Sequence, residues 1–414
     1  MDDKTKFVLG VVLSVGIVLR GYFLLNYELI DGRQYHIFLS DEAVVGLMGK
    51  HIAAGVELPL FFYGQQYLGA FEAYLAALSF SIFGISMVAL KLVPLMFSIM
   101  LLFVVYLLGT KLFDPRVGVV SAALIAVPSP YFFGWGFKAR GGFIEYVVLS
   151  LIVLLLFSLI YFHRKDSFWL YGLWGFFAGF SLWVNQLILP FLALLALYAW
   201  FKSPALLSGA RLWVLLVTFV VGASPLIISN VLDPFVTFRI LARKGLDVRG
   251  DVSRLDYQDK VERIVGGLAE RVVEVPDLGQ NLAILFGFQG SVIEEPGLLS
   301  TPAFLNLPEP PHLYWAVILF FFGSALVPWL YRKIRAGPTS PAQGNVAKDR
   351  DNGSKLDLLV FLSFASLVGY FRPRYLLVCY PLMAIMAAAF LNDLRGKYPK
   401  KIYTGLFAFT IALN

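Results

Sequence analysis

Two adjacent acids, Asp41 and Glu42, follow the first long apolar run of the chain and begin a stretch with helical spacing. A carboxylate can take the proton of an attacking hydroxyl or orient that hydroxyl, which is general-base chemistry. Neighbours in a helix point about 100° apart, so the two acids cannot aim at one atom. We expect one to serve a reaction and the other to hold the segment. The alternative is that both only complement the dipole of a first helical turn.

A second polar group follows in the same segment, in the run from Tyr63 to Tyr74. Amide side chains both donate and accept hydrogen bonds, as recognition of sugar hydroxyls requires. The alternative is a polar turn that leads into a surface helix. The candidates for a sugar or acceptor pocket are Tyr63, Gln65, Gln66, Glu72 and, from a later segment, Glu145.

That later segment carries two cations, Lys138 and Arg140, just before Glu145. Glu145 lies inside an apolar run, where an acid costs roughly 2.5–3.5 kcal/mol to insert. Ionisable groups in such places usually have a function and a partner. We expect the partner to be Arg140 or Lys138. The alternative is an ion pair that only locks two helices together.

A second pair of cations, Arg372 and Arg374, precedes one of the last apolar runs. An Arg fork binds phosphate with two parallel hydrogen bonds. With Lys138 and Arg140, these side chains could clamp the phosphate of a donor and stabilise the charge that grows on it as it leaves. The alternative is simple anchoring to lipid headgroups.

The elements that must position these residues are membrane helices. The chain has 414 residues, of which 59% are hydrophobic and 15% charged. A soluble domain has ~45–50% apolar and ~25% charged residues, and many apolar runs here approach the ~20 residues that cross a bilayer. We therefore predict an all-α integral membrane protein. The runs are 7–25, 70–84, 89–110, 117–134, 143–162, 168–184, 187–201, 212–229, 313–331, 356–370, 375–391 and 402–414.

Basic residues in the short loops orient these runs, because cytoplasmic loops collect Lys and Arg. All the basic loops fall on one side only if 70–84 does not cross. We therefore predict that 70–84 is an amphipathic helix on the outer surface. About eleven spans and a cytoplasmic N-terminus follow. The net charge of +7 belongs to these loops and is no sign of nucleic-acid binding.

Under this topology the whole chain is one transmembrane module. The first outer loop, 26–88, holds the candidate acids, 230–312 is a large outer loop, and 336–355 has the composition of a cytoplasmic linker. The single cysteine, Cys379, excludes an internal disulfide. The chain ends within an apolar run, so we expect that a natural C-terminal region lies beyond it.

These residues resemble the GT-C glycosyltransferases, and among them relatives of the protein O-mannosyltransferases and aminoarabinose transferases. The likeness lies in Asp41-Glu42, in 63–74 and in 138–145, with weaker similarity in 224–230 and 374–377. The resemblance implies that Asp41 is the essential acid of the first outer loop and assists an acceptor hydroxyl, with Glu42 beside it. Relatives often carry a large outer C-terminal domain, and we expect no such domain within these 414 residues. Acceptor recognition would then fall to 230–312.

The same resemblance implies a substrate class. The donor would be a monosaccharide on dolichyl or undecaprenyl phosphate, transferred with inversion at the outer membrane face to a protein, lipid or glycan. No cofactor is required, because cations of the protein can neutralise one phosphate; a donor with two phosphates would favour a divalent metal. The partners would be the lipid-linked sugar, membrane lipids and an acceptor.

Two other functions fit the residues less well. Buried charges also line the paths of transporters and lipid flippases. Such proteins often have two similar halves and broken helices at the midplane, whereas the charged candidates here gather at one face. The third candidate is a non-catalytic scaffold that only binds carrier lipids.

Overall fold

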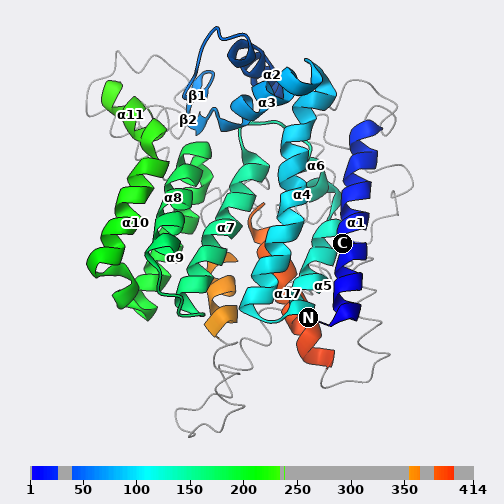
Figure 1. Cartoon of the computed structure of the whole chain (residues 1–414), viewed down its shortest axis with the longest axis vertical. Coiled ribbons are helices and arrows are strands. Elements are labelled where there is room, and N and C mark those ends of the chain that lie inside the picture. Colours follow the sequence, from blue (N-terminus) through cyan, green and yellow to red (C-terminus); the bar gives the residue numbers. More distant parts are fainter. Residues whose placement is uncertain (1, 27–39, 234–236, 238–353, 364–376, 396–414) are drawn as a thin grey trace, which may run out of the picture.

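The computed structural model describes residues 2–26, 40–233, 237, 354–363 and 377–395, and most of them are helical (Figure 1). Three helices are long and apolar enough to cross a membrane: α1 (Asp3–Leu25), α4 (Met87–Leu112) and α7 (Phe143–Tyr161). A bent pair, α10 (Gly209–Gly222) and α11 (Ser224–Leu232), would make a fourth span with a 64° bend. The chain is therefore a membrane protein. The total of about eleven spans stays a prediction.

Several shorter apolar helices complete the described bundle. They are α5 (Pro115–Ala126), α6 (Pro130–Trp135), α8 (Phe168–Val184), α9 (Leu189–Lys202) and α17 (Cys379–Arg395), with the 3-10 turns η1 (Gln186–Ile188) and η2 (Pro204–Leu207).

Two predicted runs are split by proline. The run 117–134 ends as α5 at Ala126, just ahead of Pro128, and starts again as α6. The run 212–229 breaks at Ala223, ahead of Pro225. Proline lacks an N–H, and it disfavours helical geometry in the residue before it. The runs were therefore correctly placed but were not single helices.

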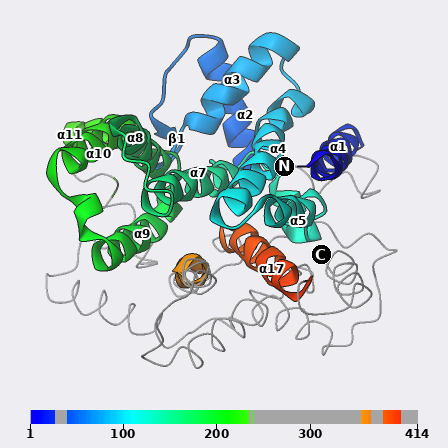
Figure 2. The same ribbon diagram turned by 60° about the horizontal axis from the view of Figure 1, so that its bottom comes forward.

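The helix α7 lies at the centre of the bundle. In its most apolar window 83% of the residues are buried, compared with 17% for α1. Figure 2 shows α7 and α4 in the middle, with α1 on one side and α8, α9 and α10 on the other. The outer face of α1 is apolar, with Phe7 72% and Val18 69% exposed, as a lipid-facing helix requires.

Close packing between α8 and α10 follows from small residues. A Cβ atom on Gly175 or Gly179 of α8 would collide with backbone carbonyls of α10, and one on Gly222 of α10 would collide with α8. Small residues spaced in this way let two membrane helices approach closely.

Arg20 is a charged residue within the span α1, and it binds α1 to α4 and α5. Its Nε donates to Ser98 Oγ at 2.8 Å, and its Nη2 donates to Ile125 O at 2.8 Å. The carbonyls of Ile125 and Ala126 lie in the last turn of α5, where backbone carbonyls have no N–H partner within the helix. This buried cation thus has a structural task.

One end of the bundle carries a small cap. It consists of α2 (Ser40–Ala53), the antiparallel hairpin β1 (Phe61–Phe62) and β2 (Gln65–Gly69), and α3 (Phe71–Phe83). Figure 1 shows this cap beyond the end of α4 and α7. The stretch 70–84 thus lies at the end of the bundle as α3 and does not run through it.

Candidate functional site

Glu42 is a buried anchor of the cap. Its side chain is fully buried, and its Oε1 accepts from Lys91 Nζ of α4 at 2.8 Å and from Ala139 N at 3.2 Å. Lys91 Nζ also donates to Phe137 O at 3.2 Å. Breaking a buried ion pair costs about 3–5 kcal/mol. Glu42 therefore binds α2 firmly to α4 and to the turn 136–142.

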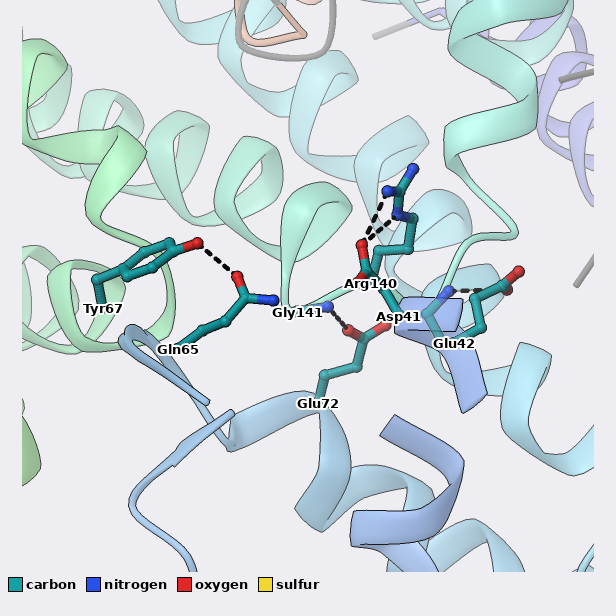
Figure 3. A network of polar contacts seen from close by, with 8 residues as sticks. Asp41, Glu42, Gln65, Tyr67, Glu72, Arg140 and Gly141 are labelled. Carbon is teal, nitrogen blue, oxygen red and sulfur yellow. Dashed lines mark hydrogen bonds and ion pairs between the residues drawn. The ribbon is translucent and has the colours of Figure 1, made fainter. Parts of the chain in front are cut away.

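Asp41 faces a different partner and is partly accessible. Its Oδ2 accepts from Arg140 Nε at 3.1 Å and from Arg140 Nη2 at 2.8 Å (Figure 3). The Asp41 side chain is 33% exposed and that of Arg140 is 11% exposed. The guanidinium also lies 5.4 Å from the centre of the Trp135 ring, a cation–π contact. The two neighbouring acids therefore have separate partners, and of the two only Asp41 is accessible.

Glu72 holds the turn that carries Arg140. Its Oε2 accepts from Gly141 N at 2.6 Å and Gly142 N at 2.9 Å (Figure 3). Both glycines have left-handed φ angles, +86° and +81°, which residues with a Cβ rarely adopt. Burial raises the pKa of Glu72 well above 4.5, the nearby Glu145 and Glu42 raise it further, and the two N–H groups oppose this rise.

The predicted ion pair of Glu145 is wrong. Arg140 pairs with Asp41, and both carboxylate oxygens of Glu145 are buried without a hydrogen-bond partner. The reason lies in the local geometry. Glu145 is in the first turn of α7, which begins after Gly142, and Glu72 from α3 has taken the N–H groups at that helix end.

Three of the five candidates for sugar contacts, Tyr63, Gln65 and Gln66, lie on the hairpin and are half-buried, whereas Glu72 and Glu145 are buried on α3 and α7. Tyr67 OH donates to Gln65 Oε1 (Figure 3). Tyr63 OH lies 3.0 Å from His51 Nδ1. The backbone oxygen of Gln66 accepts from Thr237 Oγ1 at 2.8 Å. The hairpin is therefore tied to α2 through Tyr63 and His51.

Other predicted parts lie outside the described residues. These are Arg372 and Arg374, most of the loop 230–312 and nearly all of the linker 336–355. Within the described ranges, no three His, Cys, Asp or Glu side chains gather as a metal site would require.

Lys91 is the site residue that sequence reasoning missed. It is 2% exposed and lies in an otherwise apolar stretch at the start of α4. A lone cation in such a helix is itself a functional signal. That signal could have identified Lys91, but not its partner Glu42, which is far away in sequence.

Known proteins share this architecture. A family model described as dolichyl-phosphate-mannose-protein mannosyltransferase matches residues 70–228. No curated protein sequence matches the chain. Among solved structures, the chain is similar to the apo form of the Archaeoglobus fulgidus oligosaccharyltransferase, with a TM-score of 0.50 and 17% identity over 99% of this chain and 55% of that chain. It is also similar to ArnT from Cupriavidus metallidurans bound to undecaprenyl phosphate, with a TM-score of 0.52 and 11% identity over 94% of this chain and 61% of that chain.

These matches confirm the resemblance to GT-C glycosyltransferases at the level of the fold. The chain spans between half and two thirds of the length of these structures, 55% and 61%. The family match begins at α3 and ends within α11. It therefore includes Glu72, Lys91 and Arg140 and leaves out Asp41 and Glu42.

Proposed function

We propose that the chain transfers a monosaccharide from a polyprenyl-phosphate donor to an acceptor hydroxyl at the outer face of the membrane. The observation that carries this proposal is the pair of Asp41 and Arg140, a partly exposed acid 2.8 Å from a guanidinium at one end of a membrane bundle. Sugar transfer from a lipid phosphate needs one group for the attacking hydroxyl and one for the leaving phosphate. This pair supplies both.

The acceptor oxygen forms a bond to the anomeric carbon while the bond from that carbon to the phosphate oxygen breaks. The hydroxyl proton passes to Asp41, and the electron pair of the broken bond leaves with the lipid phosphate. Attack from the face opposite the phosphate inverts the anomeric carbon. Arg140 stabilises the charge that develops on the phosphate.

The neighbouring groups have supporting tasks. Lys138, whose Nζ lies 4.9 Å from the centre of the Trp135 ring, adds positive charge on the phosphate side, and Arg372 and Arg374 are proposed to do the same. Tyr63, Gln65 and Gln66 bind hydroxyls of the sugar or of the acceptor. Glu42 acts on the reaction only by holding α2 in place.

The orientation is supported by the opposite end of the bundle. Basic residues gather there in the last turns of α4 and α9, in the loop after α7 and at the start of α10: Lys111, Lys202, Arg164, Lys165 and Arg211. Exposed tryptophans lie near the same helix ends: Trp169, Trp200 and Trp213. Basic loops favour the cytoplasm, and exposed Trp favours an interface.

Two of the cations at the site end, Lys91 and Arg140, are paired with Glu42 and Asp41, so these two add little net charge there. We therefore propose that the basic end faces the cytoplasm and that the site lies at the outer face.

The likeness to ArnT, whose structure contains undecaprenyl phosphate, supports a lipid phosphate as the carrier. The test is transfer of labelled sugar from a panel of undecaprenyl- and dolichyl-phosphate monosaccharides in membranes that contain the protein. We expect labelled product and release of the polyprenyl phosphate with at least one donor. Movement of a labelled lipid across the bilayer without any sugar transfer would instead identify a flippase.

A further inference from the structure

The start of α7 is capped by another helix. Its N-cap is Gly142, which has no side chain to offer, and its third residue is Glu145. In a capping box an acid at that third position reaches back to the N–H of the N-cap. Here Glu72 of α3 accepts that N–H and the one before it, and both oxygens of Glu145 have no hydrogen-bond partner. A residue distant in sequence has replaced the local cap.

The contact fixes the backbone on one side of Arg140. Glu72 binds Gly141 N at 2.6 Å, and Glu42 binds Ala139 N at 3.2 Å. Arg140 lies between these two anchors, and its own side chain binds Asp41. Three acids of the cap therefore hold three successive residues of one turn, two through the backbone and one through the side chain (Figure 3).

We infer that Glu72 is a positioning residue, which sets the place of Arg140 against Asp41 through the N–H groups of Gly141 and Gly142. This inference rests on the proposed function and refines it. Glu72 was predicted to line a sugar or acceptor pocket, but it is 1% exposed and its Oε2 already accepts two hydrogen bonds. It acts on the turn and does not touch substrate.

A hydrogen-bond role differs from an acid–base role in what a substitution does. Glu72→Gln keeps an oxygen that can accept both N–H groups, and it removes an ionisable carboxyl that lies near Glu145. Glu72→Ala leaves both N–H groups without an acceptor. If Glu72 positions the turn, the Gln variant should therefore keep the turn and the transfer intact, and the Ala variant should not.

The experiment compares wild type, Glu72→Gln and Glu72→Ala in two measurements. Hydrogen exchange of the peptide containing Gly141 and Gly142 reports on the turn without any need for activity. Sugar transfer reports on Arg140, and a misplacement of about 1 Å lowers such rates roughly 100-fold. Asp166→Ala is the matched control, because Asp166 is an exposed acid paired with Arg211 at the opposite end.

We expect faster exchange and a roughly 100-fold lower kcat in Glu72→Ala, and near wild-type values in Glu72→Gln and Asp166→Ala. Equal loss of transfer in the Gln and Ala variants, with the turn still protected in Gln, would make Glu72 an acid–base or substrate residue and overturn the inference. Unchanged exchange in Glu72→Ala would also overturn it. If wild type itself transfers no sugar, the proposed function fails, while the exchange result still decides whether Glu72 holds the turn.

Discussion

At the scale of the residue, the site depends on how differently two neighbouring acids are placed. Glu42 is fully buried against Lys91, whereas Asp41 is 33% exposed beside Arg140. A buried, ion-paired carboxylate cannot approach a substrate without breaking contacts that hold the fold. The accessible acid is therefore the one that can take part in a reaction.

The pair of Glu42 and Lys91 yields a stability prediction. Glu42→Gln or Lys91→Met alone leaves an unpaired charge in a buried site, which costs about 3–5 kcal/mol. The double variant removes both charges, so it should lose clearly less than the sum of the two single variants. Thermal unfolding of the four proteins in detergent measures this coupling. Additive losses would show that the two side chains do not depend on each other.

Sequence reasoning reached part of this arrangement. The spacing of Asp41 and Glu42 predicts that the two acids do not aim at one atom. In the structure Asp41 pairs with Arg140 and Glu42 pairs with Lys91. The assignment of Arg140 or Lys138 to Glu145 was wrong. Proximity along the chain suggested that pairing, but Glu42 is 49 positions from Lys91 and Glu72 is 69 from Gly141. Pairs so far apart are set by packing of the cap, which no local pattern encodes.

At the scale of the element, the turn between α6 and α7 decides where Arg140 lies. Its glycines are required by the backbone, because Gly141 has a φ of +86° and a Cβ there would lie 3.0 Å from Leu68 Cδ1. The positive φ favours glycine, and the close contact leaves little room for any side chain.

This turn gives the second prediction. Gly141→Ala adds strain of about 1–2 kcal/mol and should displace Arg140, so transfer should fall more than stability does. Gly10→Ala is the control, because nothing lies within 4 Å of a Cβ at that position of α1. Transfer and thermal unfolding measured on both variants test the prediction. Normal transfer by Gly141→Ala would show that the turn tolerates movement.

The elements themselves were largely predictable. The run 168–184 coincides with α8. The run 143–162 is one residue longer than α7 at its C-terminal end. The run 70–84 is one residue longer than α3 at each end. Apolar runs define such helices because the bilayer demands internally bonded backbone. The splits ahead of Pro128 and Pro225 were missed because hydropathy alone does not register a lost N–H.

At the scale of the whole molecule, the proposed reaction requires the cap to face outward. Leu58, in the cap, is 72% exposed, and Lys165 is exposed in the loop after α7 at the opposite end. The single native cysteine, Cys379, is buried, so it adds little background to a labelling experiment.

The third prediction is the labelling pattern. A membrane-impermeant maleimide added to intact cells should label Leu58→Cys and spare Lys165→Cys. Both positions should be labelled after the cells are opened. The reverse pattern in intact cells would place the basic end outside and contradict the proposed orientation of the site.

In the proposed reaction Asp41 assists the transfer, while its neighbour Glu42 only supports the fold. The most direct measurement is kcat for sugar transfer by Asp41→Asn beside wild type and Asp166→Asn, with thermal unfolding of each. Loss of a general base lowers rates by about 10²–10⁴-fold, so we predict a fall of that size in Asp41→Asn, with unfolding close to wild type and normal transfer by Asp166→Asn. Transfer by a folded Asp41→Asn protein at the wild-type rate would contradict the account.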